Sequence, residues 1–122
     1  MRNILIIDDD PVICALLQSF LSLKRYHVEC VSKLEDALKA ITNKPFDIVL
    51  TDMKMPDVVG AEIIKRIFDT KPGIKLIAMS GDTSFDKLPS DLRANIPFLR
   101  KPFRLQEVER LILDLNSQYK EV

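Results

Sequence analysis

The stretch FDIVLTDMKMP, residues 46–56, joins a continuous apolar run to an acidic residue and a loop that contains proline. Ile48 to Thr51 is short and rich in β-branched residues, which is typical of a strand buried on both faces of a parallel sheet. Asp52 follows directly, and Pro56 favours a turn away from the strand. This stretch predicts a central strand whose carboxyl end presents a carboxylate.

The N-terminal segment repeats this organisation. Residues 3–7 form a second continuous apolar run, and the acidic sequence Asp8-Asp9-Asp10 followed by Pro11 ends it. Asp10 is suited to cap a helix, and proline is suited to the first helical position. Apolar residues then recur at helical spacing, at Ile13, Leu16, Leu17, Phe20 and Leu21. The segment therefore predicts a strand, an acidic loop and an amphipathic helix.

Strands and helices alternate along the rest of the chain. Further strands are expected at residues 27–31, 74–79 and 96–99, and further helices at 34–41, 60–69 and 105–115. The pattern Ser32 to Glu35 is that of a capping box, which predicts that Ser32 caps the second helix. Within residues 82–95, Pro89 allows only a short or irregular helix.

Five strands that alternate with helices predict an α/β fold, with a parallel sheet covered by helices on both faces. The strand at 27–31 alternates like a half-exposed strand, and Pro97 lies inside the predicted fifth strand. Both features are typical of sheet edges. The expected class is a flavodoxin-like (βα)5 doubly wound sheet of order 2-1-3-4-5, with its switch point between the first and third strands.

The composition predicts one domain over residues 1–122, because 47% apolar residues are enough for a single core. Eighteen basic and 18 acidic residues cancel, so no net charge favours nucleic acid or an anionic membrane. No apolar run approaches the ~20 residues of a membrane span, and the N-terminus lacks a signal-peptide pattern. A soluble cytoplasmic protein is expected, with Cys14 and Cys30 as reduced core thiols.

Charged and hydroxyl side chains follow the predicted strands at their carboxyl ends. Asp8 and Asp9 follow the first strand and Asp52 the third, so three carboxylates are expected to meet at the switch point. Their mutual repulsion favours a hard divalent cation, and Mg²⁺ suits such a carboxylate site. Ser80 and Lys101 follow the fourth and fifth strands. Together these groups can hold a phosphoryl group, with Asp52 as the attacking oxygen.

Four segments carry a resemblance to one family, the receiver domains of response regulators in two-component signalling. They are Ile4 to Asp10, Asp52 to Pro56, Ala78 to Gly81, and Phe98 to Phe103. The resemblance covers essentially the whole chain. It implies a phosphorylation switch, which catalyses only its own phosphorylation and dephosphorylation. The phosphoryl donor would be a histidine kinase or a histidine phosphotransfer protein.

The resemblance also implies a role for each matching position. Asp52 would accept the phosphoryl group, and Lys101 would bind its oxygens. Mg²⁺, or Mn²⁺ in its place, would bind Asp9, Asp52 and the Lys54 backbone carbonyl, with Asp8 assisting through water. Ser80 and Phe98 would be the paired switch residues, and the Lys101–Pro102 peptide bond would be cis.

The same resemblance implies two kinds of contact with other chains. The face made by the fourth helix, fifth strand and fifth helix would contact a downstream protein or a fused output domain. A phosphorylation-dependent dimer would also use such a face, and no direct contact with nucleic acid is expected from this domain. The chain departs from the family pattern at Val58 and Val59, which are expected to give the loop after Asp52 a more apolar rim. It also departs at Ala94 and Asn95 and at the prolines 89 and 97, so this face is expected to be unusual.

Three alternatives remain open from the sequence. An aspartate-nucleophile phosphatase usually has a second acid two residues after the nucleophile, whereas this chain has Lys54 there. A flavodoxin-like nucleotide carrier needs a phosphate cradle, which residues 8–11 would oppose by charge. A phosphate-independent interaction module with the receiver fold would not need the intact acidic set. Lys54 and Asp82 are expected to flank the path of water to Asp52, so exchanging them should change the phosphoryl lifetime.

Overall fold

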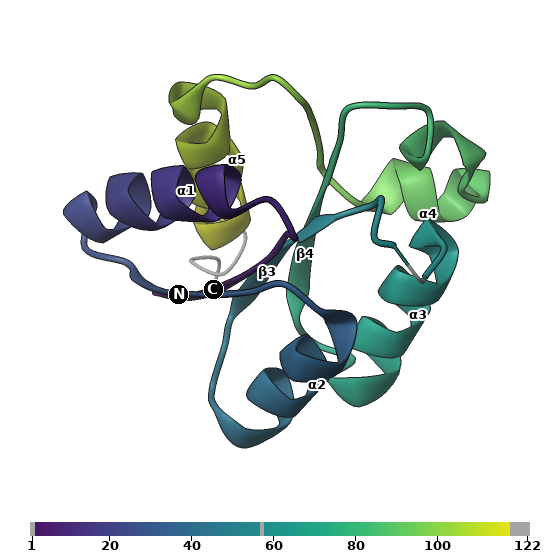
Figure 1. The fold of residues 1–122 in the computed structure, drawn as a ribbon, viewed down its shortest axis with the longest axis horizontal. Helices are drawn as coiled ribbons and strands as arrows, with labels where there is room; N and C mark the ends of the chain where they lie inside the picture. The colour runs from purple at the N-terminus through teal and green to yellow at the C-terminus, as the bar shows by residue number, and fades with distance from the viewer. Residues whose placement is uncertain (1, 57, 118–122) are drawn as a thin grey trace.

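The computed structural model describes residues 2–56 and 58–117, and its centre is a parallel sheet of five strands (Figure 1). The strands are β1 (Asn3–Ile7), β2 (His27–Val31), β3 (Ile48–Asp52), β4 (Lys75–Ser80) and β5 (Phe98–Arg100). The α-helices are α1 (Pro11–Leu23), α2 (Leu34–Asn43), α3 (Gly60–Thr70), α4 (Ser90–Asn95) and α5 (Leu105–Ser117), and η1 (Phe85–Lys87) is a 3₁₀ turn. The strand order is β2-β1-β3-β4-β5, which confirms the predicted doubly wound class.

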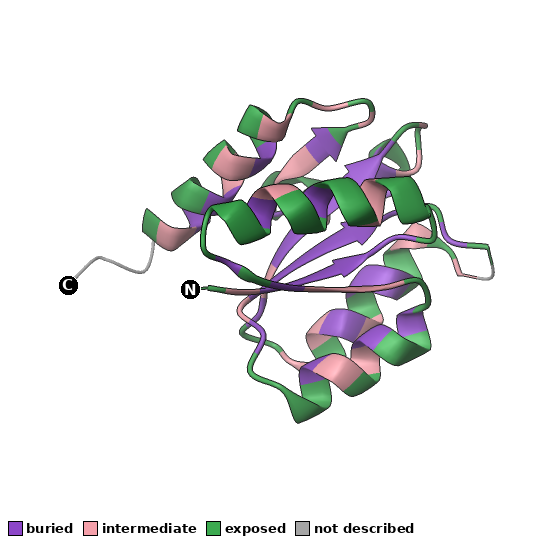
Figure 2. Cartoon of the chain, turned by 60° about the vertical axis from the view of Figure 1, so that its left-hand side comes forward, coloured by how far each residue is buried: buried purple, intermediate pink, exposed green. Residues whose placement is uncertain are grey.

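The sheet separates two apolar clusters, one on each face. Helices α1 and α5 pack against one face, while α2 and α3 cover the other (Figure 1). Because successive strand residues point to opposite faces, Ile4 and Ile6 of β1 join the first cluster and Leu5 and Ile7 the second. Figure 2 shows the central strands buried and the outer faces of the helices exposed. Burial on both faces explains why the strand sequences are continuously apolar.

The first two helices begin differently. Asp10 caps α1 as predicted, because its Oδ1 accepts a hydrogen bond from the Val12 backbone N–H at 2.9 Å. The predicted capping box at Ser32 is wrong. Lys33 is the N-cap of α2, and no side-chain capping bond is present there in the described part of the chain. The helix starts one residue later than the box requires, and Glu35 instead pairs with Arg66 of α3 at 2.8 Å.

Two apolar expectations need correction. Leu16 was expected on the buried stripe of α1, but it is 45% exposed, since the stripe passes through Leu17 and Leu21 instead. Pro97 precedes β5 and does not lie inside it. Its carbonyl oxygen still accepts a hydrogen bond from the Ala78 N–H at 2.9 Å, which a proline can support. The irregular fourth helix is confirmed as η1 and the short α4.

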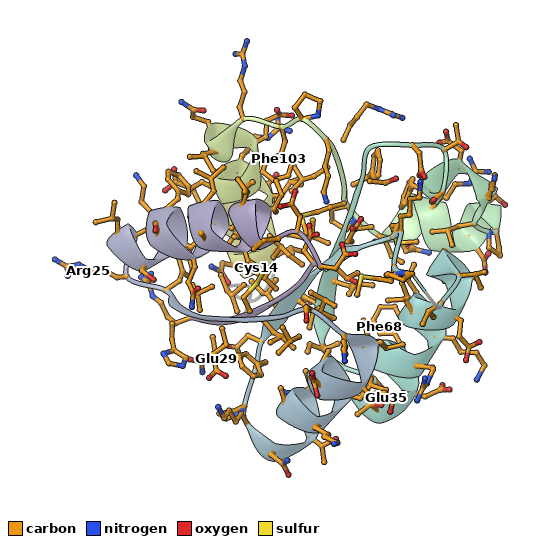
Figure 3. All side chains as sticks on the ribbon, in the orientation of Figure 1. Cys14, Arg25, Glu29, Glu35, Phe68 and Phe103 are labelled. Atoms are coloured by element: carbon orange, nitrogen blue, oxygen red, sulfur yellow. A yellow bond between two sulfur atoms is a disulfide. The ribbon has the colours of Figure 1, made fainter. Side chains whose placement is uncertain are left out.

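The expectation of reduced core thiols is also wrong. Cys14 and Cys30 are joined in a disulfide, with a Cα–Cα distance of 6.0 Å, and both residues are only half-buried. The physical reason is topological. Helix α1 runs back over the sheet beside the edge strand β2, so cysteines separated by 16 residues in sequence meet in space. Figure 3 labels Cys14 on α1.

Arg25 follows α1 and its C-cap residue Lys24, and its backbone lies in the left-handed region, with φ of 72°. Its N–H donates to the Ser22 carbonyl at 3.0 Å, and the Tyr26 N–H donates to the Leu21 carbonyl at 3.1 Å. These are the bonds of a helix end that glycine usually serves, because a side chain is strained at positive φ.

Arg25→Gly should therefore raise the free energy of unfolding by about 1 kcal/mol, measured by urea denaturation. Lys24→Gly is the matched control, because Lys24 has an ordinary φ of −89°. This control should be destabilised. A loss of stability in Arg25→Gly would contradict the interpretation.

None of the helices formed within residues 2–56 and 58–117 combines the length and apolarity needed to cross a membrane.

Candidate functional site

Three carboxylates meet where β1 and β3 end. These strands are parallel neighbours with Ile7 opposite Thr51, so the next residues, Asp8 and Asp52, emerge side by side. One carboxylate oxygen from each of Asp8, Asp9 and Asp52 lies within 4.8 Å of the others. Asp8 and Asp52 are buried, at 1% and 6% exposure, whereas Asp9 is exposed. The predicted acidic cluster is therefore brought together by the strand register.

Lys101 lies between two of these acids. It follows β5, and its backbone N–H donates to the Ser80 carbonyl oxygen at 2.8 Å, which fixes it beside the end of β4. Its Nζ donates to Asp8 Oδ2 at 2.7 Å and lies 3.5 Å from Asp52 Oδ2. The Lys101–Pro102 bond is cis, as predicted. The sequence could place Lys101 at this edge, but not its direct bond to Asp8.

Burial and charge act in opposite directions on these groups. Burial and then the charge of Asp8 raise the pKa of Asp52, and the positive charge of Lys101 reduces this effect only in part. For Lys101, burial acts to lower the pKa, but the hydrogen bond to Asp8 and the charges of Asp8 and Asp52 raise it more. Lys101 therefore stays protonated and offsets part of the acidic charge at the site.

The Ser80 hydroxyl is engaged with Asp82. Ser80 Oγ donates to Asp82 Oδ1 at 2.8 Å, and the Asp82 backbone N–H donates to Ser80 Oγ at 3.1 Å. The Ser84 N–H also donates to Asp82 Oδ1 at 2.8 Å. Hydrogen bonds from Ser84, and then from Ser80, hold the pKa of Asp82 well below its usual range. Asp82 was not predicted as the partner of Ser80, although an Asp two residues after a Ser in a turn is a typical signal for such bonds.

Lys54 and Asp82 form an ion pair at the cavity that the acid cluster also lines. Lys54 Nζ lies 3.6 Å from Asp82 Oδ2. Both residues line a cavity of about 560 Å³ together with the acid cluster, Pro56 and Lys101. The Lys54 side chain is 77% exposed and that of Asp82 39%, so the pair contributes little to stability.

Phe98 packs against a ring that the sequence did not indicate. It lies half-buried on β5, and its ring stacks on Phe85 of η1 with centroids 4.3 Å apart and planes at 16°. The Arg100 guanidinium lies 5.5 Å from the Phe98 centroid. Phe98 pairs with Ala78 in the sheet, two residues before Ser80. The ring and the hydroxyl therefore lie on neighbouring strands.

The donor set suits a hard divalent cation. Carboxylate oxygens are the ligands that Mg²⁺ and Ca²⁺ prefer, and the two buried acids of the three share a single cation, Lys101. The Lys54 backbone N–H donates to Asp52 Oδ1 at 3.2 Å, which orients that carboxylate. Metal binding by the Lys54 carbonyl oxygen stays a prediction.

The strand order defines a flavodoxin-like, doubly wound fold, and the acidic cluster lies at its switch point, beyond the carboxyl ends of β1 and β3, where ligands bind in open sheets of this class. The family profile described as "Response regulator receiver domain" matches residues 4–113. The chain therefore belongs to the response regulator receiver domains, as the sequence resemblance implied.

The relatives that this chain matches differ in length. The transcriptional regulatory protein ZraR of Salmonella typhimurium is 34% identical over 109 residues, which cover 86% of this chain and 25% of ZraR. The chain thus spans about a quarter of the length of that relative. The response regulator receiver protein CpdR of Brucella abortus is 29% identical, with 93% of this chain and 98% of CpdR covered.

Solved structures agree with this assignment. A CheY-like response regulator receiver domain protein from Methanospirillum hungatei matches with a TM-score of 0.87 and 30% identity, covering 100% of this chain and 99% of that one. The response regulator TrrA from Thermotoga maritima, solved in complex with Mg(2+)-BeF, matches with a TM-score of 0.82 and 28% identity, covering 94% and 99%.

Proposed function

We propose that this chain accepts a phosphoryl group on Asp52, in a reaction that requires Mg²⁺, and that this modification switches its conformation. The observation that carries the proposal is the acid cluster itself, in which Lys101 bridges Asp8 and Asp52 at 2.7 and 3.5 Å. A buried carboxylate beside a fixed cation and two further acids is suited to in-line transfer, where positioning and charge compensation supply most of the catalysis.

The donor would be a phosphohistidine of a sensor kinase or a histidine phosphotransfer protein. A carboxylate oxygen of Asp52 forms a bond to phosphorus as the phosphorus–nitrogen bond breaks, and the histidine ring leaves with the electron pair of that bond. Lys101 would shift from Asp8 towards the phosphoryl oxygens. Mg²⁺, when bound by Asp9, Asp52 and the Lys54 carbonyl with Asp8 assisting, supplies positive charge to the same oxygens.

The Ser80 and Phe98 side chains would change position when Asp52 is phosphorylated. The Ser80 hydroxyl now donates to Asp82, so it must leave Asp82 in order to donate to a phosphoryl oxygen. Movement of Ser80 would free space beside β5, into which Phe98 could turn once its stack with Phe85 opens. The face formed by α4, β5 and α5 would then contact a downstream protein, a fused output domain or a second copy.

The relatives support two versions of this protein. CpdR, which this chain matches over nearly its full length, supports a receiver that acts alone over residues 1–122. ZraR, matched over about a quarter of its length, supports a receiver that controls a larger attached protein. In both versions we place the domain in the cytoplasm, with no nucleic-acid contact of its own. The solved Mg(2+)-BeF complex of TrrA supports Mg²⁺ as the cation.

Acetyl phosphate, a small phosphodonor, tests this function directly. Incubation with Mg²⁺ followed by intact-mass measurement should show one added phosphoryl group, and EDTA should prevent it. Asp69→Asn is a matched control that removes an exposed acid of α3 whose partner is Lys65 of the same helix, and it should still be phosphorylated. Phosphorylation without any divalent ion would contradict the proposed requirement for Mg²⁺, and steady turnover of an aryl phosphate substrate would favour the phosphatase alternative.

Removing the ion pair between Lys54 and Asp82 should shorten the lifetime of the phosphoryl group on Asp52. In Lys54→Ala/Asp82→Ala, water would reach Asp52 more freely, and we expect hydrolysis up to about fivefold faster, the factor that matches ~1 kcal/mol for an exposed ion pair. Lys54→Asp/Asp82→Lys exchanges the two charges but keeps an ion pair at these positions, so a wild-type lifetime there beside a shorter one in the double alanine variant would identify the pair as the cause. Unchanged half-lives in both variants would contradict a gating role.

A further inference from the structure

The disulfide lies next to the backbone of Asp8, in the loop that follows β1 and carries Asp8 and Asp9. Cys14 is in the first turns of α1, and its Sγ lies 3.5 Å from the Asp8 carbonyl oxygen. Cys30 is on β2, next to Val31, whose carbonyl oxygen accepts a hydrogen bond from the Asp8 N–H at 3.1 Å. The two cysteines therefore contact the Asp8 backbone on one side and its hydrogen-bond partner on the other.

We propose that Cys14 and Cys30 form a reversible redox pair, and that their oxidation state sets the divalent-cation affinity of the acid cluster. Neither cysteine has a role in the phosphoryl transfer proposed above. The proposal begins with the observed juxtaposition of the disulfide and the Asp8 segment.

The chemistry is thiol–disulfide exchange with a small disulfide, such as oxidised glutathione, as the oxidant. The thiolate of one cysteine attacks the small disulfide, one reduced thiol leaves, and the second cysteine then displaces the other. The two protein thiols lose two electrons and two protons, and the small disulfide gains them. Because Cys14 and Cys30 are both half-buried, reagents can reach the pair from the β2 edge.

Reduction changes the contacts of Asp8 without separating α1 from β2. A Cys14 thiol at its present position can donate a weak S–H hydrogen bond to the Asp8 carbonyl, which the disulfide sulfur cannot do. The Gln18 side-chain amide donates to the Val28 carbonyl at 3.2 Å, so α1 stays attached to β2 in either state. The effect of reduction is therefore local to the first turn of α1 and the acidic loop.

The oxidised form should bind Mg²⁺ more tightly. The disulfide fixes the start of α1 against β2, and thus limits the positions that the Asp8 and Asp9 backbone can adopt before the ion binds. A site that is already ordered loses less conformational freedom on binding. We expect the dissociation constant for Mg²⁺ to be about threefold lower in the disulfide form than in the dithiol form.

Two measurements test the proposal. First, the full chain is equilibrated in buffers of varied glutathione ratio and alkylated, and intact mass counts the free thiols. Cooperative loss of both thiols in oxidising buffer is expected, whereas two alkylated cysteines at every ratio would overturn the proposal. Second, calorimetric titration with Mg²⁺ compares the oxidised and reduced protein with Cys14→Ala/Cys30→Ala, whose affinity should not respond to the buffer.

The redox proposal rests on the proposed function only in taking the acid cluster as the Mg²⁺ site. The Mg²⁺ affinities measured by calorimetry distinguish failure of one from failure of the other. Equal Mg²⁺ affinities in the two redox states, with phosphorylation of Asp52 intact, would overturn the redox coupling alone. Absence of Mg²⁺ binding in both states would overturn both. Cys30→Ala keeps the Cys14 thiol and should show the reduced-state affinity in every buffer, and tighter binding in this variant would also count against the proposal.

Discussion

Lys101→Met should lower the free energy of unfolding by roughly 2 kcal/mol at neutral pH when no divalent ion is present. Lys101 donates to Asp8 at 2.7 Å, and the Asp8 side chain has no exposed surface. Removing the lysine leaves a buried carboxylate beside Asp52 without its cation. Loss of one partner from a fully buried pair usually costs about 3–5 kcal/mol, and the smaller value here reflects the 21% exposure of the Lys101 side chain.

Mg²⁺ should restore much of this loss. A divalent ion bound by Asp8, Asp9 and Asp52 provides the positive charge that Lys101 supplied, and a ligand that binds only the folded state adds stability by mass action. Urea denaturation in EDTA and in millimolar Mg²⁺ would measure both effects. The matched control is Lys54→Met, because the Lys54 side chain is 77% exposed and pairs only with the half-buried Asp82 in the described part of the chain. It should change stability by less than about 1 kcal/mol in either buffer.

A Lys101→Met variant as stable as the wild-type protein in EDTA would show that Asp8 finds other compensation. The Asp10 N–H, which donates to Asp8 Oδ1 at 3.0 Å, is the available alternative.

The fold could be predicted from the sequence because its signals are local and repeated. Each central strand is buried on both faces, so continuous apolar runs such as residues 4–7 and 48–51 mark the sheet centre. The edge strands follow from alternation in β2 and from Pro97 beside β5. Strand order then fixes which strand ends meet, and for this reason Asp8, Asp9 and Asp52 could be placed together without coordinates.

The features that were missed depend on side-chain direction and on packing between distant segments. The disulfide requires the crossing of α1 beside β2, which the spacing of Cys14 and Cys30 does not reveal. The bond from Ser80 to Asp82 depends on the turn after β4, and the stack of Phe98 on Phe85 depends on where a three-residue 3₁₀ turn lies. The N-cap of α2 is Lys33, one residue after the predicted Ser32, and sequence patterns do not resolve a difference this small.

Asp52→Asn should abolish phosphorylation by acetyl phosphate and, in the absence of divalent ions, raise the melting temperature by a few degrees at neutral pH. The first effect follows because the amide is not the carboxylate nucleophile that the proposed reaction needs. The second follows from electrostatics, since burial and the Asp8 charge oppose ionisation of Asp52 in the folded protein. A simple loss of structure would not give the two results together.

The pH dependence fixes the sign of the stability effect. Because the pKa of Asp52 is raised in the folded state above its ordinary value of 3.8, the folded protein binds this proton more tightly than the unfolded chain. The resulting stabilisation is fully present below that ordinary value and is lost as the pH rises through the raised pKa. The asparagine side chain of the variant would carry no charge at any pH, so the variant should be more stable than wild type at neutral pH. The difference should close as the pH falls below the ordinary pKa of the carboxyl.

When a divalent ion is present, the wild-type protein should be more stable than the Asp52→Asn variant. Wild-type protein should gain stability if its three carboxylates bind Mg²⁺ as proposed, whereas the variant keeps only Asp8 and Asp9 and should gain less. Thermal unfolding of both proteins and of Asp69→Asn, across pH and with EDTA or Mg²⁺, would measure this. Asp69 belongs to an exposed pair with Lys65, so its replacement should leave the pH profile and the Mg²⁺ response at wild-type values. If Asp52→Asn melted below wild type in EDTA at neutral pH, charge repulsion at the strand ends would not be the dominant force on Asp52, and the electrostatic basis for the divalent ion would fail with it.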